Sequence, residues 1–224
     1  MNSAALIQPK IHQQIEFLYQ AFLDLDESEK MLLMILSVVY KPIGIAKLEQ
    51  IIDILGSRGL LPKAKKEQRL SAQKKEKLIR QSLLIVNSDG VQLNRLLANR
   101  LTAEIGQLNT LFECTSHEKL VEIIMAAEQV APSFNSSSLL KKEVDRCRVI
   151  RDLYYLDEIE QVTSALAFNK NPQIIDHSKN SILVEILFLS FNLTTFLKLP
   201  DVLQYQAFAT LIRMCQINGQ SCEY

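Results

Sequence analysis

The strongest constraint on the fold of this chain is one short stretch, LLIVNSDGVQLN, at residues 83–94. Two apolar runs, LLIV and VQLN, flank a turn made of Asn, Ser, Asp and Gly. Asn, Asp and Gly tolerate the positive φ that a tight turn demands, so the stretch predicts a β-hairpin. No further strand pattern follows between residue 95 and residue 224, and we expect this part of the chain to be helical.

Helical patterns precede the hairpin. A short amphipathic helix is expected at residues 11–25, followed by a helix whose run MLLMILSVVY is apolar nearly all round and suits the centre of a core. Asp26 with Glu29 three residues later fits the N-terminal cap of that second helix. Three helices followed by a hairpin is the order of a winged helix, and the three segments are residues 30–40, 45–55 and 72–84.

The second half of the chain consists of apolar helical stretches separated by prolines and polar breaks. Helices of this length joined by short turns predict an antiparallel stack that resembles a helical-repeat array. The expected fold class is therefore mainly α, with an N-terminal winged helix followed by an antiparallel helical array. We place two domains at residues 1–112 and 113–224. The expected helices of the second half are residues 96–112, 118–129, 139–153, 156–168, 182–196 and 202–215.

Charge is distributed unevenly along the chain. The whole sequence has 25 basic and 25 acidic residues, yet residues 58–80 contain nine basic residues and only two acidic ones, a local balance of +7. A cluster of this kind binds phosphate backbones through counterion release, and a winged helix places its third helix in the major groove. Lysines outnumber arginines here, so we expect a double-stranded DNA partner that is bound with little sequence specificity.

Helical spacing divides the third helix of the predicted winged helix into two sides. Ala72, Ile79 and Leu83 fall on the side that is expected to pack. The opposite side is expected to face a duplex, with the turn of the hairpin as the wing tip. The candidate nucleic-acid-binding residues are Lys63, Lys65, Lys66, Arg69, Gln73, Lys74, Lys77, Arg80, Gln81 and Ser88.

A second interpretation is open for this surface. Charge runs are commonly solvated faces, and winged helices in large assemblies also serve as protein docking modules. The alternative function is therefore a protein–protein interaction module that uses the winged helix and the helical array as a scaffold. A second basic cluster, KKEVDRCRVIR at residues 141–151, is expected to be an ordinary exposed face, and the neighbouring Tyr154 and Tyr155 are expected to pack between helices.

No catalytic signature is present in the sequence. It contains no GxxxxGK[ST], HExxH or GxSxG motif, and His12, His117 and His177 are far apart. Cys114 and His117 have the spacing of half a zinc site, but the other cysteines offer no matching pair. We expect a non-catalytic chain with no metal and no cofactor.

The sequence also predicts the compartment. Four scattered cysteines without a CxxC pair, together with the lack of a signal-peptide pattern, indicate reduced thiols in a cytoplasmic protein. The most apolar stretch, residues 181–199, is interrupted by Glu185, Asn192 and Lys198, which favours a buried helix over a membrane span.

Three successive segments carry a resemblance to a known family: KMLLMILSVVYKPIGIAKLEQIIDILG, then RLSAQKKEKLIRQSLLIVNSDGVQLNRLLANRL, then LVEIIMAAEQVAP. Together they resemble the non-catalytic N-terminal region that precedes the motor in some bacterial Swi/Snf-type helicase-like ATPases. The likeness covers under half of the chain, from Lys30 to about Pro132, and winged helices of signal-transduction ATPases and transcription regulators share the pattern. The lysine-rich insertion at residues 62–70 departs from it.

The resemblance implies a regulatory accessory region of a larger DNA-dependent ATPase. On this view the motor domain is a partner of the region described here, and the ATP-binding residues lie beyond Tyr224.

Overall fold

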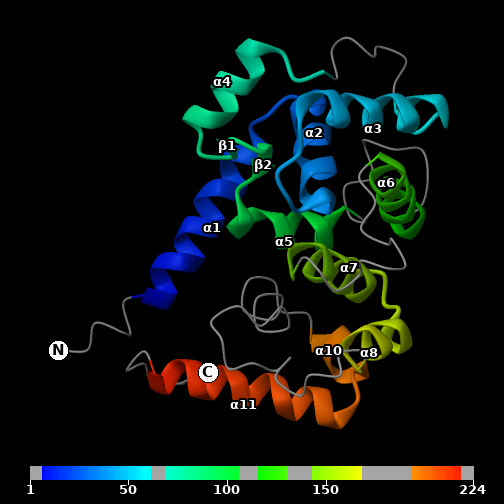
Figure 1. Cartoon of the computed structure of the whole chain (residues 1–224). Helices are drawn as coiled ribbons and strands as arrows, with labels where there is room; N and C mark the ends of the chain where they lie inside the picture. The colour runs from blue at the N-terminus through cyan, green and yellow to red at the C-terminus, as the bar shows by residue number, and fades with distance from the viewer. Residues whose placement is uncertain (1–6, 62–68, 106–115, 131–142, 168–192, 218–224) are drawn as a thin grey trace.

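The computed structural model describes residues 7–61, 69–105, 116–130, 143–167 and 193–217 (Figure 1). The predicted fold class is confirmed, because these residues are mainly helical with one small antiparallel hairpin. In chain order the elements are α1 (Ile7–Leu23), α2 (Glu27–Val39), α3 (Ile45–Ser57), α4 (Ala72–Arg80), β1 (Leu84–Asn87), β2 (Gly90–Leu93), α5 (Arg95–Glu104), α6 (Ser116–Val130), α7 (Glu143–Tyr155), α8 (Ile159–Ala167), α10 (Leu193–Lys198) and α11 (Asp201–Ile217).

Helices α2, α3 and α4 and the hairpin form the winged helix. Strands β1 and β2 are antiparallel, in a register that runs from Leu84 opposite Leu93 to Asn87 opposite Gly90. Ile43, in the connection between α2 and α3, adds a third short piece to this sheet. Its backbone N–H and carbonyl each form a 2.9 Å hydrogen bond with the backbone of Val91. This bridge ties the start of α3 to the wing.

Helix α2 is the centre of the larger core. Every residue from Met31 to Val39 is buried, as the all-round apolar pattern predicts. The predicted capping box is confirmed: the Glu29 backbone N–H donates to the Asp26 carboxylate at 2.9 Å, and the Asp26 N–H donates to the Glu29 carboxylate at 3.1 Å. Helices α1, α3, α5 and α6 contribute further buried apolar residues around α2.

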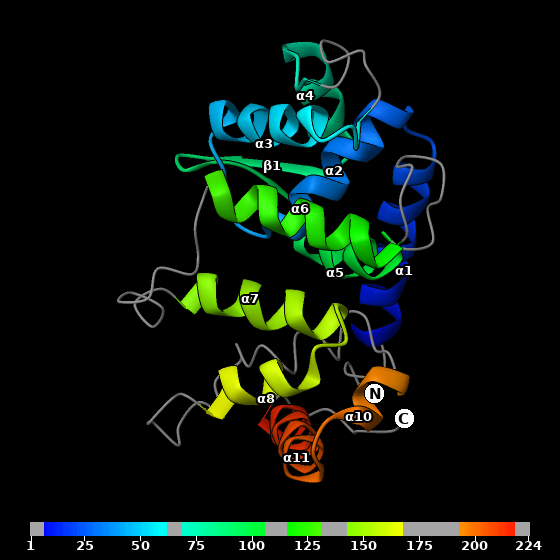
Figure 2. The same ribbon diagram turned by 90° about the vertical axis from the view of Figure 1, so that its right-hand side faces the viewer.

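The remaining helices form a second, smaller core. It consists of Ile150, Tyr154, Val162, Phe196, Leu199 and Ala207, from α7, α8, α10 and α11 and the turn that follows α10. Tyr154 is buried, as expected. Its ring lies edge to face with that of Tyr155, and the two ring centres are 5.6 Å apart. Figure 2 shows α6, α7 and α8 as successive layers below the winged helix, with α11 furthest away.

The predicted division at residues 112 and 113 separates α6 from the winged helix. In the structure Ile123, Ala126 and Ala127 of α6 are fully buried in the same cluster as α2 and α3. Most of the predicted helix at residues 182–196 lies outside the described residues, and its last residues belong to α10.

Gly90 is the residue on which the close approach of the wing to Ile43 depends. Its φ is +133°, and an added Cβ would lie 2.2 Å from the carbonyl oxygen of Ile43. We expect Gly90→Ser to lower the free energy of unfolding by about 2 kcal/mol or more. A serine is strained at this φ, and its Cβ would clash with main-chain atoms of Ile43, which cannot move aside easily.

Chemical denaturation of the Gly90→Ser variant measures this loss, and Gly44→Ser is the matched control. Gly44 is the N-cap of α3 with a φ of −64°, and an added Cβ meets nothing within 4 Å. Serine is a good N-cap residue, so this substitution should be neutral or stabilising. Equal losses of stability from the two substitutions would contradict the proposed role of the bridge.

Candidate nucleic-acid interface and a buried charge network

Helix α4 lies at one end of the molecule in both ribbon views (Figures 1 and 2), and the two strands of the wing lie just below it in Figure 1. The helix begins where the Ser71 hydroxyl accepts a hydrogen bond from the Lys74 backbone N–H at 3.2 Å. The wing turn is closed by Asn87, whose side-chain oxygen accepts from the Asp89 N–H at 3.0 Å. Ser88 and Asp89 at the tip are exposed. The chain therefore forms the helix and the turn where the sequence predicts them.

The packed side of α4 differs from the predicted one. Leu78 is fully buried, whereas Ile79 is 41% exposed and Ala72 is exposed. The prediction that Ala72 and Ile79 pack is wrong, although Leu83 is buried as expected. Leucine 78 and isoleucine 79 are equally apolar, so the sequence of this short helix left two possible packed sides. Burial in the same cluster as residues of α2 and β1 selects Leu78.

This rotation turns two candidate DNA-binding lysines toward α2. The Lys77 ammonium lies 2.6 Å from the carboxylate of Glu29, whose side chain is only 2% exposed. The Lys74 ammonium donates a hydrogen bond to the Ser28 hydroxyl. The expectation that both lysines face away from the protein is corrected in part: they contact the N-terminal end of α2, although the Lys77 side chain remains 44% exposed.

The same lysines influence the cap of α2. Burial disfavours the ionised form of Asp26, but hydrogen bonds from Ser28 and Glu29 and the charges of Lys74 and Lys77 outweigh it. The pKa of Asp26 therefore lies below its usual value of 3.8. A charged Asp26 is the form that accepts the capping hydrogen bonds, so the α4 lysines help to stabilise the start of α2.

The other predicted interface residues divide into three groups. Gln73, Ser88 and Arg80 are exposed, and the Arg80 side chain, 76% exposed, approaches Glu76 at 3.9 Å. The Arg69 guanidinium lies 4.0 Å from the carboxylate of Asp53 on α3. Gln81 is half-buried, and its side-chain oxygen lies inside the protein. The expected outward position of Gln81 is therefore also corrected. Outside the described residues lie Lys63, Lys65 and Lys66.

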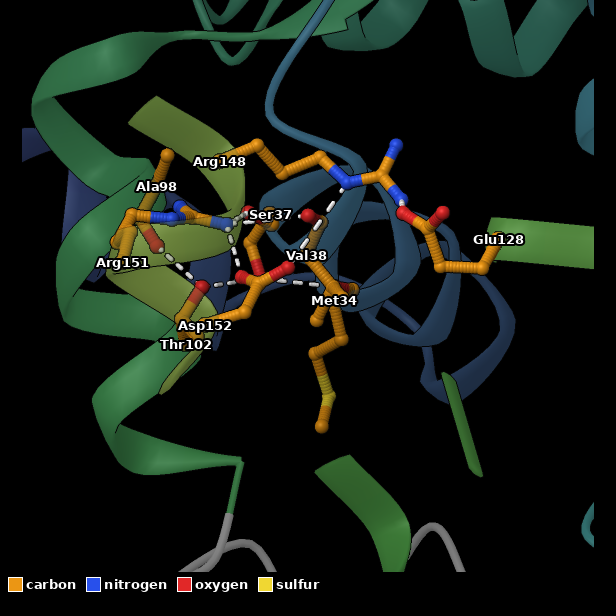
Figure 3. Close-up of polar contacts among 9 residues, drawn as sticks. All are labelled: Met34, Ser37, Val38, Ala98, Thr102, Glu128, Arg148, Arg151 and Asp152. Carbon is orange, nitrogen blue, oxygen red and sulfur yellow. Dashed lines mark hydrogen bonds and ion pairs between the residues drawn. The ribbon is translucent and has the colours of Figure 1, made fainter. Parts of the chain in front are cut away.

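A second group of charged residues, buried between α2 and α7, was missed in the sequence (Figure 3). Arg148 and Arg151 of α7 are both 0% exposed, so the prediction that the basic cluster at residues 141–151 forms an ordinary exposed face is wrong for these two residues. The apolar Ile150 and Tyr154 mark one packed side of α7, but no local pattern in this segment indicates that the arginines are buried as well.

Arg151 caps the C-terminal end of α2. Its Nη2 atom donates to the Val38 carbonyl at 3.1 Å and also to the Ser37 carbonyl, and its guanidinium lies 4.0 Å from the centre of the Tyr40 ring. The last carbonyls of a helix have no partner within the helix and carry partial negative charge. A buried guanidinium donates hydrogen bonds to these carbonyls and also offsets their partial negative charge.

Asp152 completes the network between the two arginines. One carboxylate oxygen lies 3.1 Å from Arg151 Nη2, the other lies 3.8 Å from Arg148 Nε, and Arg148 also pairs with Glu128 of α6. Burial raises the pKa of Asp152 to about 6, although the charges of Arg151 and Arg148 act in the opposite direction. The network joins α2, α6 and α7 through charge in the protein interior.

Neither place has the composition of a metal centre. Among the residues that the structure describes, no three His, Cys, Asp or Glu side chains gather in a way that could hold a metal ion. Likewise, no described helix is both long and apolar enough to cross a bilayer.

No protein-family model matches this chain, and neither a curated protein nor a solved structure matches it significantly. The resemblance to the region that precedes the motor of Swi/Snf-type ATPases stays a prediction that rests on the sequence segments quoted above.

Lys77 provides a test of the contact between α4 and α2. We expect Lys77→Met to lower the free energy of unfolding by about 1–2 kcal/mol, because the nearly buried Glu29 carboxylate loses its cation. Lys75→Met is the control in the same urea titration, since Lys75 forms no ion pair with any described residue. A larger loss from the Lys75 substitution would contradict the assigned contact.

Asp152 predicts a specific dependence of stability on pH. Its pKa, about 6 in the folded chain against a usual 3.8, means that the folded state holds the proton more tightly. The stability that protonated Asp152 contributes is fully present below pH 3.8 and is lost as the pH rises through about 6. Relative to Asp152→Asn, the wild-type chain should lose roughly 3 kcal/mol over this window.

Denaturation of both chains across the pH range measures this difference. Glu160→Gln, which removes an exposed carboxyl group of α8, is the control and should run parallel to the wild type. If the stability difference between wild type and Asp152→Asn does not change with pH, the assigned shift is wrong.

Proposed function

We propose that this chain is a non-catalytic accessory region that binds double-stranded DNA with little sequence specificity, and that it regulates a larger DNA-dependent ATPase or transcription-related protein. The observation that carries the proposal is the position of α4. It is the third helix of a winged helix, it lies at the outer end of the molecule, and the most basic segment of the chain leads directly into it (Figure 1).

The exposed groups of this face support contacts with the DNA backbone. Three side chains are open to solvent here: Gln73 and Arg80 of α4 and Ser88 of the wing tip. Each can donate a hydrogen bond to a phosphate oxygen. Lys63, Lys65 and Lys66 precede α4 in the sequence and add three positive charges. Lys74 and Lys77 have a structural role toward α2, so the proposed contact depends chiefly on the other residues of the set.

A separate observation favours the second candidate function, a protein docking module. Ile79 of α4 and Ile85 and Val86 of β1 are about equally exposed, at 41%, 40% and 42%. Exposed aliphatic side chains on the helix and the wing suit an apolar protein surface better than a phosphate backbone. On this hypothesis the lysines only keep the surface solvated.

Titration of a labelled generic duplex by fluorescence anisotropy, across a series of salt concentrations, separates the two functions. DNA binding predicts that log K falls linearly with log salt, with a slope of about −0.9 for each phosphate neutralised. Combined substitution of Lys63, Lys65 and Lys66 by Glu should reduce the slope by about three and weaken binding for every sequence alike. Arg80→Glu should reduce it by about one.

Lys198→Glu is the matched control, because Lys198 lies on α10, far from α4 in both views (Figures 1 and 2). Thermal unfolding of each variant verifies that the fold is intact. No binding by the wild-type chain at low salt would exclude the DNA-binding proposal and leave the docking module. Full affinity in the triple lysine variant would remove the segment before α4 from the interface.

A further inference from the structure

Lys77 lies at the border between the packed side and the open side of α4. Its ammonium is 2.6 Å from the Glu29 carboxylate, yet 44% of its side chain is exposed. Gln73 lies four residues before it and Arg80 three residues after it, so the three side chains are neighbours on the helix surface. Gln73 and Arg80 are open to solvent. A duplex that contacts these two residues would therefore pass close to Lys77 as well.

The Glu29 carboxylate holds Lys77 more firmly than a fully exposed carboxylate would. The Glu29 side chain is only 2% exposed, and it also accepts a hydrogen bond from the Asp26 backbone N–H at 3.1 Å. Little water competes for this carboxylate, and removing its cation would leave a buried charge unpaired. A DNA phosphate that took Lys77 away from Glu29 would have to offset that cost.

The neighbouring residues at this end of α2 act in the same direction. The Ser28 hydroxyl accepts a hydrogen bond from the Lys74 ammonium and donates one to the Asp26 carboxylate at 2.6 Å. Asp26 also interacts electrostatically with both lysines. Asp26 and Glu27 are exposed, and their negative charges repel a phosphate backbone. The start of α2 therefore offers the α4 lysines an anionic environment of the kind that DNA would offer.

We propose that the contact between α2 and α4 masks Lys77, and that Glu29 competes within the chain against DNA phosphates for this lysine. The contact limits how many phosphates α4 neutralises and so regulates the affinity of the interface. Weakening the contact between Glu29 and Lys77 adds one cation to the DNA-facing side. This inference rests on the proposed function, since it concerns how strongly the α4 face binds a duplex.

Glu29→Gln tests this masking in the salt titration of a labelled generic duplex. Glutamine keeps the shape of the side chain and can still accept the hydrogen bond of a capping box, so the start of α2 is preserved while the charge is lost. The slope of log K against log salt should become steeper by about 0.9, and the affinity should rise roughly fivefold to tenfold at about 0.1 M salt. Thermal unfolding verifies that the variant is folded.

Glu27→Gln is the matched control, because it removes the same charge two residues earlier in α2. Glu27 is exposed and pairs with Lys30 at 3.5 Å, and neither residue belongs to α4. This substitution should leave the slope unchanged. A second variant, Lys77→Met combined with Glu29→Gln, should return the slope to the wild-type value, because the added phosphate contact is made by Lys77.

The possible results separate this inference from the proposed function. If the wild type binds DNA and Glu29→Gln binds with the same slope, the masking is wrong and the DNA-binding proposal stands. An equal gain from Glu27→Gln, or a gain that survives in the double variant, would overturn the masking in the same way. No binding by either the wild type or Glu29→Gln at low salt would overturn both proposals.

Discussion

Helix α2 is buried from Met31 to Val39, and polar groups at both of its ends are satisfied by other parts of the protein. An unpaired buried backbone group costs free energy comparable to a lost hydrogen bond. At the N-terminal end Asp26 and Glu29 supply the capping box. At the C-terminal end the guanidinium of Arg151, more than a hundred residues later in the chain, reaches the carbonyls of Ser37 and Val38.

A helix from each half of the fold attaches to one of these ends. Helix α4 attaches to the N-terminal end through Lys74 and Lys77, and α7 attaches to the C-terminal end through Arg151. Each cation also suits its position electrostatically: the lysines lie beside carboxylates, and the arginine lies where the helix dipole is negative. Part of the positive charge of this chain, at Lys74, Lys77 and Arg151, therefore also holds the fold together.

This division of charge affects how the candidate interface is interpreted. Of the basic residues that the sequence assigns to one surface, those at positions 74 and 77 contact α2, while Arg80 is open to solvent. The exposed face of α4 and β1 is consequently mixed, with the polar Gln73 and Arg80 beside the apolar Ile79 and Ile85. A basic run in a sequence reports how much charge is present, but the packing of the helix decides which charges a partner can reach.

The sequence by itself determined the kinds and order of the elements. Helical apolar spacing, the Asp26 and Glu29 cap and the turn at residues 87–90 are local patterns, and each acts within a few residues of the chain. Only the tertiary structure decided which side of α4 packs and that Arg148 and Arg151 are buried. Leu78 and Ile79 are equally apolar, so their own helix cannot choose between them. A buried arginine is tolerated only where a distant element offers acceptors, here the end of α2 and Asp152, and no local pattern reports such a partner.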